Sequence, residues 1–383
     1  MRKMKKVLSL LLVTSVAVAS LTACGSAKND KFYIGGIGPV TGGAAVYGLN
    51  VKNAAELAVD EINKAGGIAG KQIAFKFEDD EHDPEKSVNA YNTLKDWGMQ
   101  ILMGTVTSTP CKAVAAETFN DNMFELTPSA SSVDVITNGN VFQVCFTDPN
   151  QGIASAAYIG EKALATKVAV IYDSSDVYSS GIYEKFAQEA ANQNFEIVAA
   201  EAFTADSKSD FSVQLQKAKD AGAELVFLPI YYSEATLILT QSASLGYDPI
   251  FFGCDGLDGI LGVENFDTSL AEGVMLLTPF AADATDDKTV KFVTAYKDKY
   301  GEIPNQFAAD AYDAIYIIKA AIEKSGVKTD MSISDMSDAL KGAMTQISVD
   351  GLTGAGMTWS ATGEVNKAPR AIVIQNGAYV SVE

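Results

Sequence analysis

The chain has 383 residues and a formal net charge of −19 at pH 7, from 29 basic and 48 acidic side chains. So acidic a protein repels nucleic acid, whose binding depends on Lys and Arg side chains that neutralise phosphates. Apart from Arg2, Arg370 is the only arginine. An anionic ligand must therefore be held by hydroxyls, backbone N–H groups or helix N-termini rather than by a guanidinium clamp. The length suits two domains with a core each.

The first 23 residues predict an export signal. Basic residues at positions 2, 3, 5 and 6 precede an apolar run from 7 to 19, which is too short for a bilayer span of about 20 apolar residues. The following segment, Leu21-Thr22-Ala23-Cys24, resembles a bacterial lipobox, in which the cysteine is acylated and the peptide bond before it is cleaved. We expect residues 1–23 to be removed and Cys24 to carry a lipid that anchors the protein to the outside of a cell membrane. Residues 24–30 would form a tether. The alternative is an ordinary secretory signal that ends near a cysteine.

Strand-like apolar runs alternate with amphipathic helical runs through most of the remaining chain. The first series has strands at 31–36, 71–78, 100–104, 123–127 and 141–146, and helices at 49–65, 84–97 and 110–121. The second series has helices at 150–164, 179–193, 209–221 and 233–245, and strands at 167–172, 195–203, 224–229 and 249–252. Repeated β-α units imply parallel sheets covered by helices on both faces.

The alternation ends after a strand at 273–277. It is followed by helices at 286–300, 307–324 and 332–343 and by a β-rich tail with strands at 369–375 and 378–382. We expect two open α/β lobes side by side, with the late elements returning to both lobes and a cleft between them.

Few residues of the chain could support catalysis or metal binding. Beyond Cys24 there are three cysteines, Cys111, Cys145 and Cys254, without metal-type spacing. A disulfide between Cys111 and Cys145 is possible, but burial as small apolar side chains is favoured. His82, the only histidine, lies in the acidic run 78–83, which is typical of a solvated loop and argues against a histidine-dependent nucleophile. That run lacks the spacing of a calcium loop, so we expect no metal and no other cofactor.

Hydroxyl side chains gather where two neighbouring strands end. Residues 105–110 follow the strand at 100–104 and include Ser108; residues 128–132 follow the strand at 123–127 and include Ser129 and Ser131. Ligands of open parallel sheets bind outside the carboxyl ends of the strands. Hydroxyls at helix N-termini there make an anion site suited to a carboxylate. The alternative is that these residues only cap helices.

Acidic and phenolic side chains end the strands of the second series. They are Asp148, Asp173, Tyr178, Tyr231, Tyr232 and Asp255. Asp beside Gly is often only a turn residue, and Tyr after a strand is often only packed. A hydroxyl-lined anion site that faces carboxylates and tyrosines across a cleft nevertheless has the charge layout that a zwitterion needs.

The start of the first series resembles the leucine/isoleucine/valine-type solute-binding proteins of ABC transporters. The stretches that carry the resemblance are Ile34-Gly35-Gly36-Ile37-Gly38-Pro39-Val40-Thr41-Gly42, Tyr47-Gly48, residues 56–63 and Gly66-Gly67-Ile68. The resemblance extends over essentially the whole mature chain. It implies the type I periplasmic-binding, Venus-flytrap fold, with crossovers near 147–149, 277–280 and 355–360. Lobe 1 would comprise residues 31–147 plus 280–355, and lobe 2 residues 148–279 plus 356–383.

The resemblance also implies a ligand site. Ser108 and Ser131 match residues that hold the carboxylate of an amino acid, while Asp148 and Asp255 match those that hold its ammonium group. Tyr178 matches a tyrosine that stacks on the amino-acid backbone. Tyr47 and Tyr231 match aromatic walls of the pocket, and Ser129 joins the candidates from the same loop as Ser131. Ser179 and Cys254 stand where relatives have glycine, which leaves the side-chain specificity open.

The function that follows is that of a lipid-anchored, monomeric receptor. It would capture an amino acid, Leu, Ile or Val first, by closure of the two lobes and deliver it to a permease. No Walker motif is present, so ATP hydrolysis would belong to separate ATPase subunits. A sensory module, or a different ligand such as an amide, a urea, an aromatic acid or another amino acid, remains the alternative. An enzyme is not expected.

Overall fold

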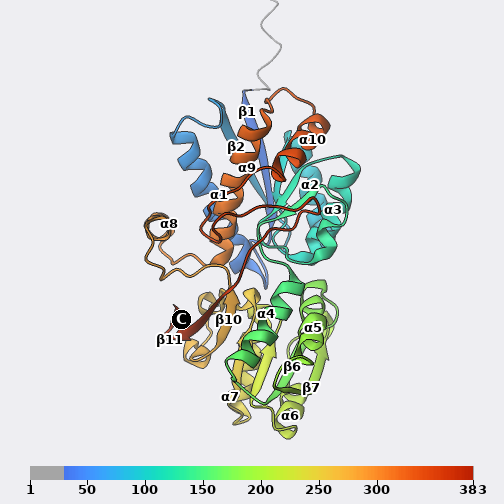
Figure 1. Ribbon diagram of the computed structural model, residues 1–383, viewed down its shortest axis with the longest axis vertical. Coiled ribbons are helices and arrows are strands. Elements are labelled where there is room, and N and C mark those ends of the chain that lie inside the picture. The colour runs from blue at the N-terminus through green and yellow to red at the C-terminus, as the bar shows by residue number, and fades with distance from the viewer. Residues whose placement is uncertain (1–29, 383) are drawn as a thin grey trace, which may run out of the picture.

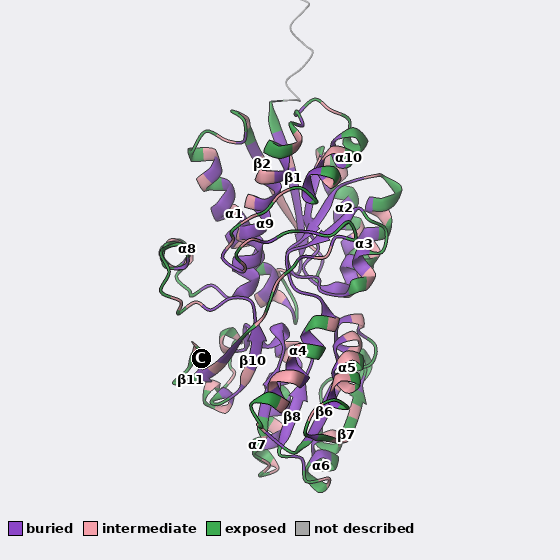
Figure 2. Cartoon of the chain, viewed as in Figure 1, coloured by how far each residue is buried: buried purple, intermediate pink, exposed green. Residues whose placement is uncertain are grey.

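The computed structural model describes residues 30–382, which form two lobes stacked along the long axis of the molecule (Figure 1). Cys24, the predicted signal peptide and most of the predicted tether lie outside the described residues. Within residues 30–382, no helix is long and apolar enough to cross a membrane. Each lobe has a central sheet of buried strands, and exposed residues concentrate on the outer helices and loops (Figure 2).

Lobe 1 is built on a parallel sheet with the strand order β2-β1-β3-β4-β5. Its strands are β1 (Lys31–Gly38), β2 (Gln72–Asp79), β3 (Ile101–Gly104), β4 (Glu125–Thr127) and β5 (Val141–Gln143). Its helices are α1 (Ala45–Lys64), α2 (Pro84–Trp97), α3 (Ser108–Asn120), α8 (Asp287–Tyr300), α9 (Gln306–Ser325) and α10 (Ile333–Met344), with the short turn η1 (Val133–Ile136). Helices α1 and α9 pack together, as do α2 and α3.

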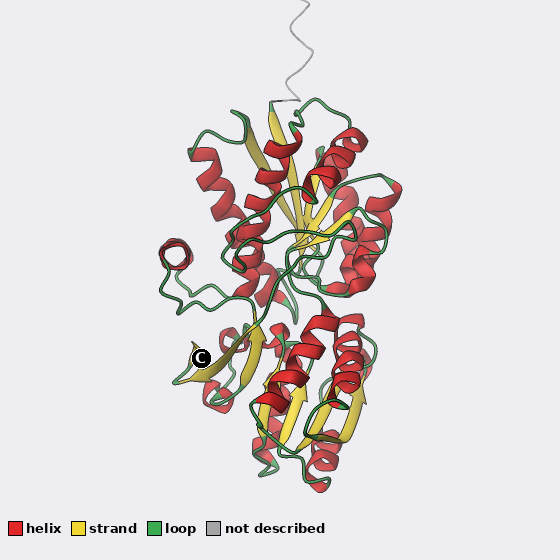
Figure 3. Ribbon diagram, viewed as in Figure 1, coloured by secondary structure: helices red, strands yellow, loops and turns green. Residues whose placement is uncertain are grey.

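Lobe 2 has a sheet with the order β12-β11-β10-β9-β8-β6-β7. The parallel strands are β6 (Lys167–Asp173), β7 (Glu196–Phe203), β8 (Leu225–Leu228), β9 (Ile250–Gly253) and β10 (Met275–Thr278), and the antiparallel edge is β11 (Arg370–Gln375) and β12 (Ala378–Ser381). The helices are α4 (Asp148–Glu161), α5 (Val177–Ala190), α6 (Ser212–Asp220) and α7 (Tyr232–Ser244), with the short turns η2 (Ala205–Ser207), η3 (Asp255–Leu257), η4 (Ile260–Gly262) and η5 (Thr268–Ala271). Figure 3 shows helices beside both sheets, so the predicted fold class is confirmed.

Local sequence explains where elements begin and how closely they pack. Helix α2 begins after Asp83, whose carboxylate accepts from Lys86 N at 2.9 Å, and it ends at Gly98 in the left-handed conformation, as N-cap and C-cap preferences require. In α1, a Cβ atom on Gly48 would lie 1.8 Å from the Pro39 carbonyl oxygen. The glycine therefore lets the loop after β1 approach α1, which fixes the position of Tyr47 next to it.

The chain passes between the lobes three times, and the third crossing lies later than predicted. The first two crossings are residues 144–147 and 279–286, but residues 356–365 stay with lobe 1. Trp359 Nε1 donates to the Gln143 carbonyl at 2.8 Å, and Gln143 N donates to the Gly363 carbonyl at 2.9 Å. Residues 356–365, which the prediction assigns to lobe 2, thus pack against lobe 1 in the structure, because the buried indole ties this segment to β5. The third crossing is the short stretch between residue 365 and β11.

The three described cysteines, Cys111, Cys145 and Cys254, are buried and free. The open alternative of a disulfide between the first two is therefore not realised. Burial raises the pKa of each of these thiols well above its usual value, which keeps them protonated and unreactive.

A buried ion pair holds the third crossing to lobe 1. Lys367 Nζ lies 2.8 Å from Asp310 Oδ1 on α9, and both side chains are fully buried. Lys367 also donates to Thr353 Oγ1 at 2.6 Å. The pair thereby fixes the point from which the chain leaves lobe 1.

Changing Lys367 to Met should therefore reduce the free energy of unfolding by about 3–5 kcal/mol, because it leaves the buried Asp310 carboxylate without its cation. The double variant Lys367→Met/Asp310→Leu should recover most of that loss. Chemical denaturation measures both. As a control, Lys319→Met breaks the exposed pair with Glu323 and should cost at most about 1 kcal/mol. Equal losses in the buried and exposed pairs would contradict this account.

Candidate functional site

The carboxyl ends of strands from both sheets meet at the boundary between the lobes, where they enclose a small cavity. Six of the eight predicted ligand-binding residues line it: Tyr47, Ser108, Ser129, Tyr178, Tyr231 and Asp255. The lining also includes Val106, Thr107, Gly256 and Phe307. The remaining two candidates lie beside it and link the lobes, since Asp148 N donates to the Ser131 carbonyl at 3.0 Å. The structure thus brings all eight predicted residues to one region.

Asp255 lies at the start of η3 and is 2% exposed. Tyr178 Oη donates to its Oδ1 at 2.7 Å, and Gln151 Nε2 donates to its Oδ2 at 3.1 Å. Burial raises the pKa of Asp255 to about 7 despite these donors. Gln151, on the first turns of α4, was not identified from the sequence, because a lone glutamine inside a helix carries no local signal.

Asp148 opens α4 and is 1% exposed. Among the described residues, no hydrogen bond of ordinary geometry reaches either of its carboxylate oxygens, although the Ser131 hydroxyl lies close enough to favour the charged form. Burial raises the pKa of Asp148 well above its usual value, and the negative charges of Asp255 and Asp176 add to this effect. Within residues 30–382, no Lys or Arg forms an ion pair with Asp148 or Asp255. Two buried carboxyl groups therefore lack a cation.

The opposite wall, on lobe 1, offers hydroxyls and a helix N-terminus. Ser108 lies in the first turn of α3, and its Oγ accepts from Ser132 N at 3.2 Å. Ser129 Oγ donates to the Val106 carbonyl at 2.6 Å. No side chain caps α3, since Thr107 at the N-cap makes no capping bond. The N–H groups of Ser108 and Thr109 at this helix start face no capping side chain and suit an anion. In the second loop, Ser132 does cap η1, since its Oγ accepts from Asp134 N at 3.3 Å.

Aromatic rings close the site between the lobes. Tyr178 stacks on Tyr231, with ring centroids 4.9 Å apart and planes 7° apart. Tyr47 Oη donates to the Gly256 carbonyl across the lobe boundary at 2.5 Å and accepts from Tyr232 N at 3.1 Å. The enclosed space is about 10 Å³, which is room for about one water molecule. An amino acid can therefore enter only when the lobes separate or the Tyr231 ring moves.

His82 does not lie in a solvated loop, as the acidic run predicted, but at the mouth of the cleft. Its Nδ1 is 2.9 Å from Thr107 Oγ1, and its ring meets the edge of Tyr231 at 5.3 Å. The cause is Asp80, which is fully buried and accepts from His82 N at 2.9 Å. That bond curls the run back into the protein. The prediction that His82 lies in a solvated loop is therefore wrong.

The mouth of the cleft is a polar cavity of about 410 Å³. One direct hydrogen bond crosses it, from Thr109 Oγ1 on lobe 1 to Asp176 Oδ1 on lobe 2, at 3.0 Å. Burial lowers the pKa of His82, which favours the neutral ring. In the part of the chain that the structure describes, no group of three or more His, Cys, Asp or Glu side chains is placed to hold a metal ion.

The site and the fold have close counterparts in known proteins. A family model described as periplasmic binding protein matches residues 31–378. The chain is 32% identical over 367 residues to the Leu/Ile/Val-binding protein homolog 3 of Brucella melitensis, covering 94% of this chain and 95% of that protein. It is 29% identical over 317 residues to the leucine-, isoleucine-, valine-, threonine- and alanine-binding protein of Pseudomonas aeruginosa, covering 82% and 84%. The substrate-binding protein of a branched-chain amino acid transporter from Streptococcus pneumoniae, solved with isoleucine, matches with a TM-score of 0.83 at 29% identity and covers 92% of this chain and 99% of that chain.

The elevated pKa of Asp255 predicts a stability effect that depends on pH. An acid whose folded pKa of about 7 exceeds its unfolded value of about 3.9 favours folding at low pH, and that contribution is lost as pH rises from about 4 to about 7. Asp255→Asn should therefore stabilise the ligand-free protein more at pH 8 than at pH 4, by about 1.4 kcal/mol for each unit of the pKa shift. Denaturation at the two pH values measures this. Asp248→Asn, an exposed residue of the same lobe, is the control, and an equal effect of both changes would contradict the assignment.

Proposed function

The chain belongs to the periplasmic binding protein family, and from this premise we propose that it captures a branched-chain amino acid, Leu, Ile or Val, for an ABC transporter. Its family consists of binding proteins, which confirms the prediction that it is not an enzyme. The single observation that carries the proposal is the pair of buried carboxyl groups, Asp148 and Asp255, that have no basic partner among the described residues. An ammonium group supplies that missing charge.

The two lobes would hold opposite ends of the ligand. The ammonium group would bind Asp255 and Asp148 on lobe 2, and the carboxylate would bind Ser108, Ser131 and Ser129 together with the free N–H groups of α3 on lobe 1. Contacts on both lobes make the closed state depend on the ligand, because a ligand shifts an equilibrium only by its differential affinity for the two states. Tyr178 would lie against the backbone of the amino acid once Tyr231 has moved from it.

The side chain of the ligand would lie among aromatic and aliphatic groups. Val106, Phe307, Tyr47 and Tyr231 line the cavity, and no Lys or Arg from residues 30–382 does. An acidic side chain would have no partner there, and the net charge of −19 opposes its approach. An added methylene in such a pocket contributes only about 1–3 kcal/mol, so Leu, Ile and Val would be weakly separated. The relatives named above carry the same ligands in their names.

Delivery would take place outside the cytoplasm. We infer that Cys24 carries a lipid and that the monomeric protein passes its ligand to a permease driven by separate ATPase subunits. The support for this is the lipobox-like segment 21–24 and the similarity to the Streptococcus pneumoniae protein, which is a substrate-binding protein of a transporter.

A thermal-shift screen with the twenty amino acids tests the ligand class. Leu, Ile and Val should give the largest rises in melting temperature, since a ligand at 100 times its dissociation constant adds about 2.7 kcal/mol of stability. Glu, Asp and Lys should give none. A largest shift with an acidic amino acid or with a non-amino-acid amide would contradict the proposed ligand while leaving the family assignment intact.

Asp255→Asn should weaken leucine binding by about two to four decades, because the ligand ammonium would lose its buried counter-charge, at a cost of about 3–5 kcal/mol. Ser108→Ala removes a neutral donor to a charged acceptor and should cost less, about 1.5–3 kcal/mol. Calorimetry measures both, with the exposed Asp248→Asn as the matched control. Wild-type affinity in the two site variants would place the ligand elsewhere.

Cys24→Ser should leave leucine binding unchanged and release the protein from membranes or block its processing, since one residue would carry the lipid. Fractionation with detergent partitioning, together with the mass of the N-terminus, measures the outcome. The lipid assignment fails if the variant is cleaved after Ala23 and still stays with the membrane.

A further inference from the structure

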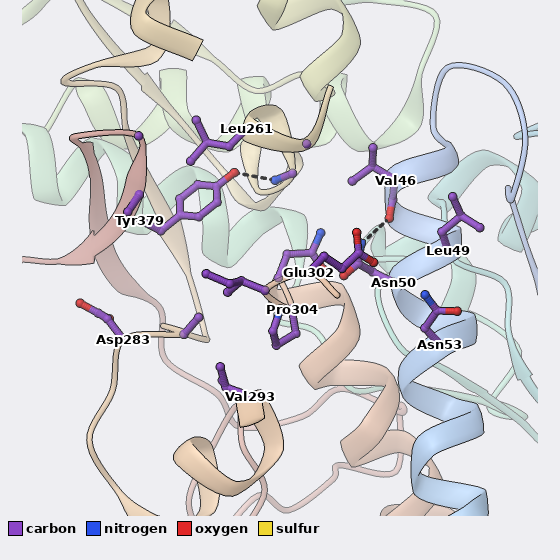
Figure 4. Close-up of a pocket in the computed structure, with 17 residues that line it drawn as sticks. Val46, Leu49, Asn50, Asn53, Leu261, Asp283, Val293, Glu302, Pro304 and Tyr379 are labelled. Atoms are coloured by element: carbon purple, nitrogen blue, oxygen red, sulfur yellow. Dashed lines mark hydrogen bonds between the residues drawn. The ribbon is translucent and has the colours of Figure 1, made fainter. Parts of the chain in front are cut away.

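A second and much larger cavity lies at the boundary between the lobes, apart from the amino-acid site. Its volume is about 620 Å³ (Figure 4). Lobe 1 contributes the first turns of α1 and residues 302–305, while lobe 2 contributes residues 259–262 and the turn at 377–379. The second crossing adds Ala282 and Asp283. None of the predicted ligand-binding residues is part of this lining.

The walls of this flank cavity, as we name the space lined by these segments, are mainly apolar. Figure 4 shows Val46 and Leu49 on α1 opposite Leu261 and Tyr379, with Pro304 and Val293 nearer the bottom of the view. Two of the exposed large apolar side chains of the protein, Leu49 at 41% and Ile303 at 60%, belong to it. Cavities of about 300–1,000 Å³ with apolar walls and a few polar groups are typical ligand sites.

The polar groups of the flank cavity define the charge of an occupant. Among the residues that the structure describes, Asp283 and Glu302 are the charged members of its lining, and no Lys, Arg or His takes part in it. The lining therefore favours a neutral or positively charged molecule, and it disfavours an anion.

The walls are also held in place by hydrogen bonds. Tyr379 Oη accepts from Gly259 N at 2.8 Å, and Asn50 Nδ2 donates to the Val46 carbonyl at 2.9 Å (Figure 4). The Asp283 carboxylate accepts from the N and Oγ of Ser381. The bonds of Tyr379 and Ser381 join β12 to η4 and to the second crossing, so the lobe 2 side of the cavity is a preformed surface.

Val46 belongs to both the flank cavity and the contact that closes the lobes. Its side chain lines the cavity, while its backbone N donates across the boundary to Tyr232 Oη at 3.1 Å. The next residue is Tyr47, which reaches Gly256 on the other lobe. One molecule can touch the lobe 1 wall and the lobe 2 wall of the cavity at the same time only when the lobes are closed.

We propose that the flank cavity is a second ligand site, for a compact apolar molecule that is neutral or positively charged, and that its occupant stabilises the closed lobes. In the proposed function the amino acid binds between closed lobes once the Tyr231 ring has moved, so the occupant and the amino acid would tighten the binding of each other by the same factor. This second half of the proposal rests on the proposed function, whereas the existence of the site does not.

Fluorescence titration with the neutral ketone Prodan tests the site on the chain from Gly25 to Glu383, which contains every element that the structure describes. Prodan should bind with one saturable site and a blue-shifted emission. The negatively charged probe anilinonaphthalene sulfonate, which is of similar size, should bind at least tenfold more weakly. Saturating leucine should tighten Prodan binding several-fold and should not displace the probe.

A substitution that fills the cavity with a side chain tests whether Prodan binds there, and the same substitution at a distant glycine is its control. A Cβ atom on Gly262 would lie 3.9 Å from Val46 Cγ1, so Gly262→Leu places a side chain in the space without a clash and should weaken Prodan at least tenfold. Gly342→Leu adds the same side chain where nothing lies within 4 Å and should leave Prodan binding unchanged. Ala282→Leu is a second filling variant, in case Gly262→Leu melts at a lower temperature than the wild type.

Three results would overturn the site: no saturable Prodan binding, wild-type affinity for Prodan in both filling variants, or competitive displacement of Prodan by leucine. An unchanged leucine affinity at saturating Prodan would overturn the coupling alone. If no amino acid binds while Prodan binds in the predicted way, the proposed function fails and the flank site is supported.

Discussion

The arrangement of the cleft depends on two carboxyl groups that are buried without a cationic partner in the described part of the chain. Moving an isolated carboxylate out of water costs several kcal/mol unless it is paired or protonated. Asp148 and Asp255 stand 1% and 2% exposed, and burial raises the pKa of both. The protein thus retains a destabilising feature in the cleft. The buried pair of Lys367 and Asp310 shows that the same chain can bury a charge together with its partner. Unfavourable burial of an unpaired carboxyl group is typical of a binding site, because a cationic group of the ligand supplies the missing partner.

The same constraint explains why the candidate site needs residues from both lobes. The carboxyl groups belong to lobe 2, while the hydroxyls and the uncapped start of α3 belong to lobe 1. In the proposed function a zwitterion would be satisfied only when both lobes surround it, so binding and closure would be one event. Tyr47 and Thr109 reach across the boundary, and the small cavity between the lobes shows how completely these groups can meet.

The sequence predicts the lobes well because β-α alternation is local, and it predicts the site partly because strand ends are easy to locate. Ser108, Asp148 and Asp255 all follow strands, and all lie at the lobe boundary. Features that depend on distant partners were missed. His82 reaches the cleft because Asp80 turns inward, and the third crossing is delayed because Trp359 is bonded to β5. Phe307 and Gln151 approach the site from the first turns of helices, where nothing in the surrounding residues marks them.

The pH dependence of leucine affinity tests the central claim most directly. In the free protein the pKa of Asp255 is about 7, and a bound ammonium group would lower it, since an opposite charge favours the carboxylate. Leucine binding should therefore release a proton near neutral pH. The affinity should rise about tenfold from pH 6 to pH 8, because Asp255 is ionised in about a tenth of the free protein at pH 6 and in most of it at pH 8. Calorimetry in buffers of different ionisation enthalpy measures both quantities. An affinity that is flat between pH 6 and pH 8, with no proton released, would contradict the account.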